Sequence, residues 1–160
     1  MRCTSGDDSF VGAGTSWTAG RAPRHKGSNT TLLAALNVQG LSAALTVEGA
    51  ADTEVFTVFV RDILVPTLRA GQIVVLDNVS FHHGATAREC IAACGCQVLF
   101  LPPYSPDFSP IEMTFSKLKE HLRRAQARSR DALDAAFTAA IAAITGHDAV
   151  GWFTHCGYKL

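Results

Sequence analysis

Two short apolar runs decide the fold: IVVLDN at residues 73–78 and VLFLPP at residues 98–103. Each run has four consecutive apolar residues and then stops, the first at Asp77-Asn78 and the second at two prolines. Unbroken apolar runs of this length are typical of strands buried on both faces, as in the interior of a parallel sheet. The residues between them, 85–94, have helical character and end at Gly95. The pattern predicts a strand–helix–strand unit whose two strands lie in one sheet.

Further elements are expected on both sides of this unit. Upstream, the apolar runs 30–37 and 41–47 flank a turn that contains Gly40, which predicts a β-hairpin. Residues 52–69 carry apolar side chains at helical spacing, and the same spacing predicts helices over 111–127 and 130–144. A packing segment follows at the end of the chain. This order predicts an α/β protein, a mixed sheet flanked by helices.

Composition narrows the class of protein. The 14 basic and 14 acidic residues cancel, which argues against a wholly basic nucleic-acid coat but leaves room for a local basic patch. No run of 18 apolar residues occurs, so we expect no membrane span and a cytoplasmic location. The five cysteines are unevenly spaced, and they fit neither a disulfide framework nor a familiar zinc pattern.

Asp77 and Glu112 are the candidate catalytic and metal-binding residues. Asp77 ends a buried strand, and Glu112 lies in the first turn of the helix that follows the next strand. Functional sites in open α/β sheets gather at the carboxyl ends of strands, so the two acids can meet at one edge. Carboxylates there can hold Mg²⁺, and two such ions about 3.5–4 Å apart can activate a hydroxyl and stabilise a leaving oxygen.

Each acid also has a structural alternative. Ser109-Pro110-Ile111-Glu112 has the pattern of a capping box with proline at the first helical position. Asp77-Asn78 is equally an ordinary turn start. Spacing alone favours these structural roles for both residues.

Basic residues continue along the helix that begins near Ile111. At 100° per residue, Lys119 and Arg123 share the face of Glu112, while Lys117 and Arg124 form a second strip. Either strip is a candidate for contact with a phosphate backbone, although a solvated helix face is the alternative. His82 is expected to contact phosphate, to position Asp77 or simply to be solvated.

The segments IVVLDNVSFHHG (residues 73–84) and VLFLPPYSPDFSPIEMTFSKLKEHLR (residues 98–123) together resemble the DDE endonuclease domain of mariner-like bacterial insertion-sequence transposases. The matching positions are Asp77-Asn78, His82, residues 101–107 and residues 110–112. The resemblance implies an RNase-H-like fold and metal-dependent cleavage and transfer of DNA strands. It also implies two Mg²⁺ or Mn²⁺ ions, and transposon ends and target DNA as partners.

The resemblance further implies a third acid, on the first and central strand of the sheet. Asp7 stands at roughly the matching separation, but the residues before it make a poor strand. We therefore expect the first central strand to be weak or missing, with residues 1–29 a poorly specified segment and residues 30–160 the catalytic domain. The helix-turn-helix region that the resemblance implies is not found in this sequence.

These departures predict a truncated or partial reading frame that is a poor transposase alone. It would then act as a homodimer or with a complementing N-terminal transposase fragment. Two alternatives stay open: an inactive fragment that binds DNA or full-length transposase, and a decayed remnant.

Overall fold

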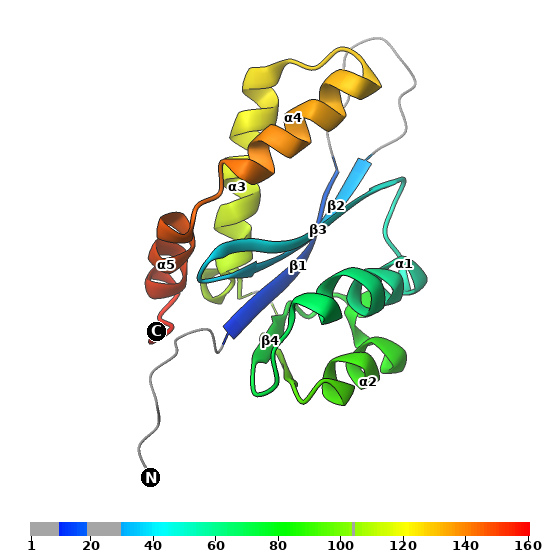
Figure 1. The fold of residues 1–160 in the computed structure, drawn as a ribbon, viewed down its shortest axis with the longest axis vertical. Coiled ribbons are helices and arrows are strands. Elements are labelled where there is room, and N and C mark those ends of the chain that lie inside the picture. The colour runs from blue at the N-terminus through cyan, green and yellow to red at the C-terminus, as the bar shows by residue number, and fades with distance from the viewer. Residues whose placement is uncertain (1–9, 19–29, 104) are drawn as a thin grey trace.

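A five-stranded mixed sheet forms the centre of the molecule, in a computed structural model that describes residues 10–18, 30–103 and 105–160 (Figure 1). The strand order is β3-β2-β1-β4-β5. Neighbouring strands are parallel from β1 through β4 to β5 and antiparallel from β1 through β2 to β3. The bounds are β1 (Phe10–Thr18), β2 (Thr30–Asn37), β3 (Gly40–Glu48), β4 (Ile73–Leu76) and β5 (Gln97–Phe100).

Strand β1 corrects the expectation that the first central strand is weak or missing. It lies in the middle of the sheet, antiparallel to β2 and parallel to β4. Its sequence, FVGAGTSWT, contains two glycines and no apolar run, so local propensity does not predict a strand. Pairing on both sides satisfies its backbone groups instead, and Val11 and Ala13 are buried. The rest of the 1–29 segment, with Asp7, lies outside the described residues.

One face of the sheet is covered by α1 (Thr53–Val58) and α2 (Ala85–Ala93). The helical path of α1 continues through a π-helical turn at Phe59–Leu64 and a 3₁₀ turn at Val65–Thr67, so the expected helix over 52–69 is present in three parts. Phe56, Phe59 and Ile91 are fully buried against this face. They belong to the α1-side core, whose sheet residues include Val11, Ala13, Leu33, Ala35, Val74 and Leu76.

The opposite face is covered by α3 (Pro110–Ala125), α4 (Arg130–Ala142) and α5 (Gly146–His155) (Figure 1). Ile111, Phe115 and Leu118 supply the apolar stripe of α3 to the α3-side core. The bounds of α3 and α4 agree with the helices expected from apolar spacing. The sequence predicted only a packing segment where α5 forms a third helix.

Tyr158 connects the C-terminal segment to the first strand of the sheet and to the loop before α3. Its hydroxyl donates a hydrogen bond of 2.8 Å to the carbonyl oxygen of Phe108, in the loop before α3. Its ring packs edge-on against Phe10 of β1 and Phe153 of α5, with centroids 5.2 Å and 5.4 Å away. The C-terminal segment thus supports the loop that leads to Glu112.

Among the described residues, no helix is both long enough and apolar enough to cross a bilayer.

Candidate active site

Asp77 follows the last residue of β4, at the carboxyl edge of the sheet. Its side chain is 24% exposed, but one carboxylate oxygen, Oδ1, is buried against Nδ1 of His82. The same nitrogen lies 3.2 Å from the carbonyl oxygen of Asp77. The other oxygen, Oδ2, is therefore the one left to face a ligand.

His82 is completely buried, with its ring centroid 4.3 Å from that of Phe56 in the α1-side core. Such burial does not support direct contact with a DNA phosphate, which was one of the roles expected for His82. It supports the second expected role, in which His82 fixes the orientation of the Asp77 carboxylate. A buried histidine held in one orientation can restrict a neighbouring ligand in this way.

His83 and Asn78, the sequence neighbours of His82 and Asp77, form a second polar pair, which lies on the surface. The ring of His83 stacks on Phe100 with centroids 4.5 Å apart, and its Nε2 is 2.7 Å from Oδ1 of Asn78. This contact fixes the loop after β4, which carries both Asp77 and His82.

Glu112 occupies the third position of α3, after Ser109 as N-cap and Pro110 at the start of the helix. Ser109 makes no side-chain cap hydrogen bond, so the capping-box alternative is wrong for this helix. The Glu112 side chain is not used by the helix end, and the residue is exposed although its carboxyl is partly surrounded by protein. It is therefore free for another role.

The two acids influence each other. Partial burial of the Glu112 carboxyl raises its pKa, and the negative charge of Asp77 raises it further, while Lys119 opposes both effects. The charge of Asp77 thus acts on Glu112, while a common site for the two acids stays a prediction. Two carboxylates that repel each other attract a cation between them.

The donor set fits a hard divalent cation in part. Carboxylate oxygens are the ligands that Mg²⁺ prefers, and the ion keeps several waters when it binds one or two carboxylates. Over the described ranges, however, no group of three or more His, Cys, Asp and Glu side chains could hold a metal. Metal binding by Asp77 and Glu112, and the two ions expected from the sequence, therefore stay predictions.

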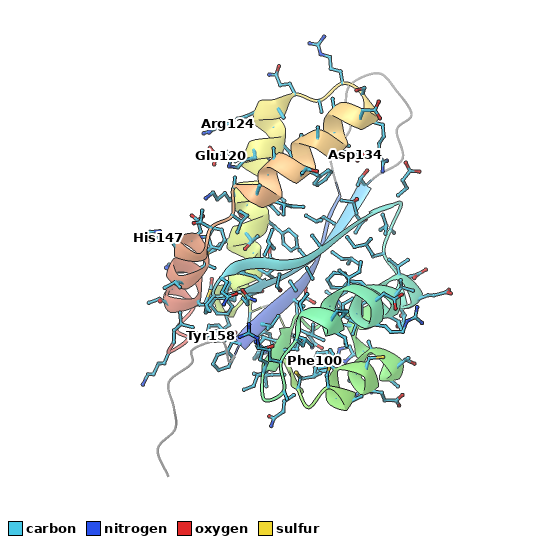
Figure 2. The ribbon with its side chains drawn as sticks, in the orientation of Figure 1. Phe100, Glu120, Arg124, Asp134, His147 and Tyr158 are labelled. Carbon is cyan, nitrogen blue, oxygen red and sulfur yellow. The ribbon has the colours of Figure 1, made fainter. Side chains whose placement is uncertain are left out.

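The four basic residues expected to contact DNA divide into two pairs. Lys119 and Arg123 lie seven and eleven positions after Glu112, which places them on its face of α3. Lys117 points elsewhere, because its Nζ lies 2.7 Å from Oδ2 of Asp148 on α5. Arg124 is paired with Glu120 on the exposed flank of α3 (Figure 2). Lys119 and Arg123 are therefore better placed than Lys117 and Arg124 for the expected contact with DNA.

A mixed sheet in the order β3-β2-β1-β4-β5, with helices on both faces, defines the RNase-H-like fold, as the sequence predicted. The model of the DDE superfamily endonuclease family matches residues 7–134. The chain belongs to this family.

Solved structures with the same fold include several of the Mos1 transposase. The Mos1 strand transfer complex superposes with a TM-score of 0.72 at 15% identity, over 94% of this chain and 51% of that chain. The Mos1 paired-end complex with the left transposon end gives 0.73 at 15% identity, over 94% and 52%. The Mos1 catalytic domain with raltegravir and Mn gives 0.69 at 14% identity, over 96% and 85%.

The chain thus spans about half the length of the first two Mos1 chains. No curated protein sequence matches it.

Proposed function

We propose that this chain is the catalytic domain of a DNA transposase and that Asp77 and Glu112 bind a divalent cation at its active site. The observation that carries this proposal is that Asp77 directly follows a strand inside an RNase-H-like sheet, where its charge acts on Glu112 in the first turn of α3. Membership of the DDE endonuclease family supports it. The Glu112 side chain is also not used to cap its helix, which leaves it available as a ligand.

Each site residue has a distinct task in this proposal. His82 holds Oδ1 of Asp77, so that Oδ2 is presented to the ion. Glu112, in the first turn of α3, would be the second carboxylate to hold the ion. The bound Mg²⁺ or Mn²⁺ would supply Lewis acidity, which activates a hydroxyl and stabilises a leaving oxygen in phosphodiester cleavage. The Mos1 catalytic domain has been solved with Mn and with Mg, which supports these metals as candidates.

Duplex DNA is the substrate that the surrounding charge favours. Lys119 and Arg123 extend one positive stripe from Glu112 down α3, where a phosphate backbone could lie against the helix. The proposal includes transposon ends and target DNA as partners, either with a second copy of the chain or with a complementing N-terminal transposase fragment. A cytoplasmic location belongs to the same proposal.

Metal binding tests the two acids directly. Mn²⁺ is titrated into the purified 160-residue chain, and free Mn²⁺ is followed by electron paramagnetic resonance. We expect weak but measurable binding to the wild-type chain. Asp77→Asn and Glu112→Gln should each abolish it, because each removes one of two charged ligands.

Glu120→Gln is the matched control, since Glu120 is an exposed acid on the same helix that pairs only with Arg124 in the described contacts. It should bind Mn²⁺ as the wild-type chain does. Binding that survives both Asp77→Asn and Glu112→Gln would contradict the proposed site. So would equal loss in the Glu120→Gln control.

A further inference from the structure

The turn that ends α5 fixes the direction of Tyr158. Gly157 has a φ of +86°, in the left-handed region. Its nitrogen donates a hydrogen bond of 3.0 Å to the carbonyl oxygen of Thr154, and the nitrogen of Tyr158 donates one of 3.0 Å to that of Phe153. These two bonds define the Schellman motif, which is commonly accompanied by an apolar contact across its outer bond. Here the rings of Tyr158 and Phe153 make that contact, with centroids 5.4 Å apart.

The side chain of Tyr158 reaches the loop between β5 and α3. Its hydroxyl donates a hydrogen bond of 2.8 Å to the carbonyl oxygen of Phe108, and its ring also packs against Phe10 of β1. Burial raises the pKa of Tyr158, so the hydroxyl keeps its proton and stays a donor at neutral pH. Burial also raises the pKa of the Cys156 thiol, and the charge of Asp107 in the same loop raises it further. The C-terminal segment therefore lies against this loop at two places.

The start of α3 lacks a side-chain cap of its own. Ser109 is the N-cap, but its hydroxyl makes no cap hydrogen bond with the first turn. A residue in this position commonly holds a backbone N–H group of that turn. Phe108 immediately precedes Ser109, and Glu112 follows Phe108 by four positions, about one helical turn. The hydrogen bond from Tyr158 therefore holds the chain about one turn ahead of Glu112, where no side-chain cap does so.

We propose that Tyr158 is a positioning residue of the active site, which holds the loop before α3 so that the Glu112 carboxylate stays in place to bind a divalent cation with Asp77. The inference rests on the proposed function of these two acids. A group that orders the chain beside a metal ligand lowers the entropy that the ligand loses when the ion binds. Tyr158 itself touches neither the ion nor DNA.

Tyr158→Phe tests the hydroxyl alone, because it keeps the ring that packs against Phe10 and Phe153. Thr145→Ala is the matched control. It removes a side chain whose described hydrogen bonds are with Asp148, at the other end of α5. Both variants are compared with the wild-type chain at a temperature at which circular dichroism shows each to be fully folded.

Hydrogen exchange followed by mass spectrometry reports on the loop without any metal. Tyr158→Phe should speed exchange in peptides that cover residues 106–112 by about two- to tenfold, the range expected for the loss of one ordinary hydrogen bond. Thr145→Ala should leave these peptides unchanged and should speed exchange at the start of α5 instead.

Mn²⁺ affinity, measured by electron paramagnetic resonance, connects the loop to the site. Tyr158→Phe should weaken binding by at least about threefold. Partners that orient a metal ligand change the affinity by about tenfold or more, and Tyr158 acts one step further from the ion. Thr145→Ala should bind Mn²⁺ as the wild-type chain does.

The outcomes separate this inference from the proposed function. If Tyr158→Phe binds Mn²⁺ as tightly as the wild-type chain, or leaves exchange at residues 106–112 unchanged, the inference is wrong and the two acids remain the proposed ligands. Equal weakening in Thr145→Ala would also overturn it, because the effect would then follow from lost stability alone. Wild-type binding that survives both Asp77→Asn and Glu112→Gln would overturn the proposed function, and this inference with it.

Discussion

The N-termini of α3 and α5 present the same local pattern and use it differently. Each has a hydroxyl residue as N-cap and an acid three positions later, Ser109 with Glu112 and Thr145 with Asp148. At α5 both capping hydrogen bonds form, and Asp148 also accepts a bond of 2.7 Å from Lys117. At α3 the side chain of Ser109 makes no cap hydrogen bond.

As a result, the pKa values of Asp148 and Glu112 are shifted in opposite directions. Hydrogen bonds from Lys117 and Thr145 hold the pKa of Asp148 well below its usual range. Partial burial and the charge of Asp77 raise the pKa of Glu112. An acid at the third helical position is thus structural where donors surround it, and it is available for a ligand where a second acid faces it.

The largest expected contrast is in stability. Asp148→Ala removes the Lys117 ion pair and the capping contacts, and we expect it to lower the free energy of unfolding by about 1–2 kcal/mol. Glu112→Ala removes no such contact and should change the free energy by less than about 0.5 kcal/mol. Urea unfolding of the metal-free chain measures both. Equal losses would mean that Glu112 also has a structural role.

The N-cap residues should differ by a smaller amount. Thr145→Ala loses a hydroxyl that accepts from the backbone nitrogen of Asp148, and it should cost about 1 kcal/mol. Ser109→Ala should cost less, because its hydroxyl makes no cap bond. Urea midpoints compared at equal m-values test this order. A larger loss for Ser109→Ala would contradict the uncapped start of α3.

Two lysines on α3 should separate stability from DNA binding. Lys119→Met should lower the slope of log affinity against log salt for duplex DNA by about one, because one phosphate contact is lost. Lys117→Met should leave that slope unchanged and lower stability by less than about 1 kcal/mol, because it breaks the bridge to Asp148. The salt slope is measured by fluorescence anisotropy with a labelled duplex. Similar slopes for both variants would contradict the division of the basic residues.

The smallest expected effects are changes in stability with pH. Because the pKa of Asp148 is lowered on folding, its stabilising contribution is present above its ordinary value of 3.8 and is lost as pH falls towards the folded value. The stability gap between the wild-type chain and Asp148→Asn should therefore narrow on acidification.

The pKa of Glu112 is shifted in the opposite direction, so its contribution to stability has the opposite pH dependence. Its raised pKa favours folding below its ordinary value of 4.5, and this contribution is lost as pH rises through the folded value. Glu112→Gln should gain stability relative to the wild-type chain as pH increases. Unfolding curves across the acid range, without metal, give both trends, and trends of the same sign would contradict the contrast.

The sequence predicts the elements whose own residues determine them. The run Ile73–Leu76 is β4 from its first residue to its last, because four consecutive aliphatic residues, three of them buried, permit little else. The expected buried strand at 98–101 is displaced by one residue, as Gln97 already pairs with Ile73, and it is an edge strand with Leu99 50% exposed, so the expected burial is wrong. The bounds of α3 follow similarly from its apolar stripe.

The sequence does not predict features that depend on distant partners. Strand β1 has glycines at two inner positions, and only its neighbours β2 and β4 make it a strand. The capping pattern at Ser109 looks as good as the one at Thr145, yet only Thr145 forms its cap bonds and only Asp148 accepts a bond from Lys117. The burial of His82 likewise depends on Phe56, which lies 26 positions earlier in the chain.

The bond between Tyr158 and Phe108 has a consequence for the order of folding. It joins residues 50 positions apart, and the same ring touches Phe10 at the first strand. The loop that leads to Glu112 therefore gains this support only after Tyr158 has left the ribosome. A nascent chain halted before Tyr158 would lack this bond, and we expect its loop before α3 to be held less firmly than in the longer chain.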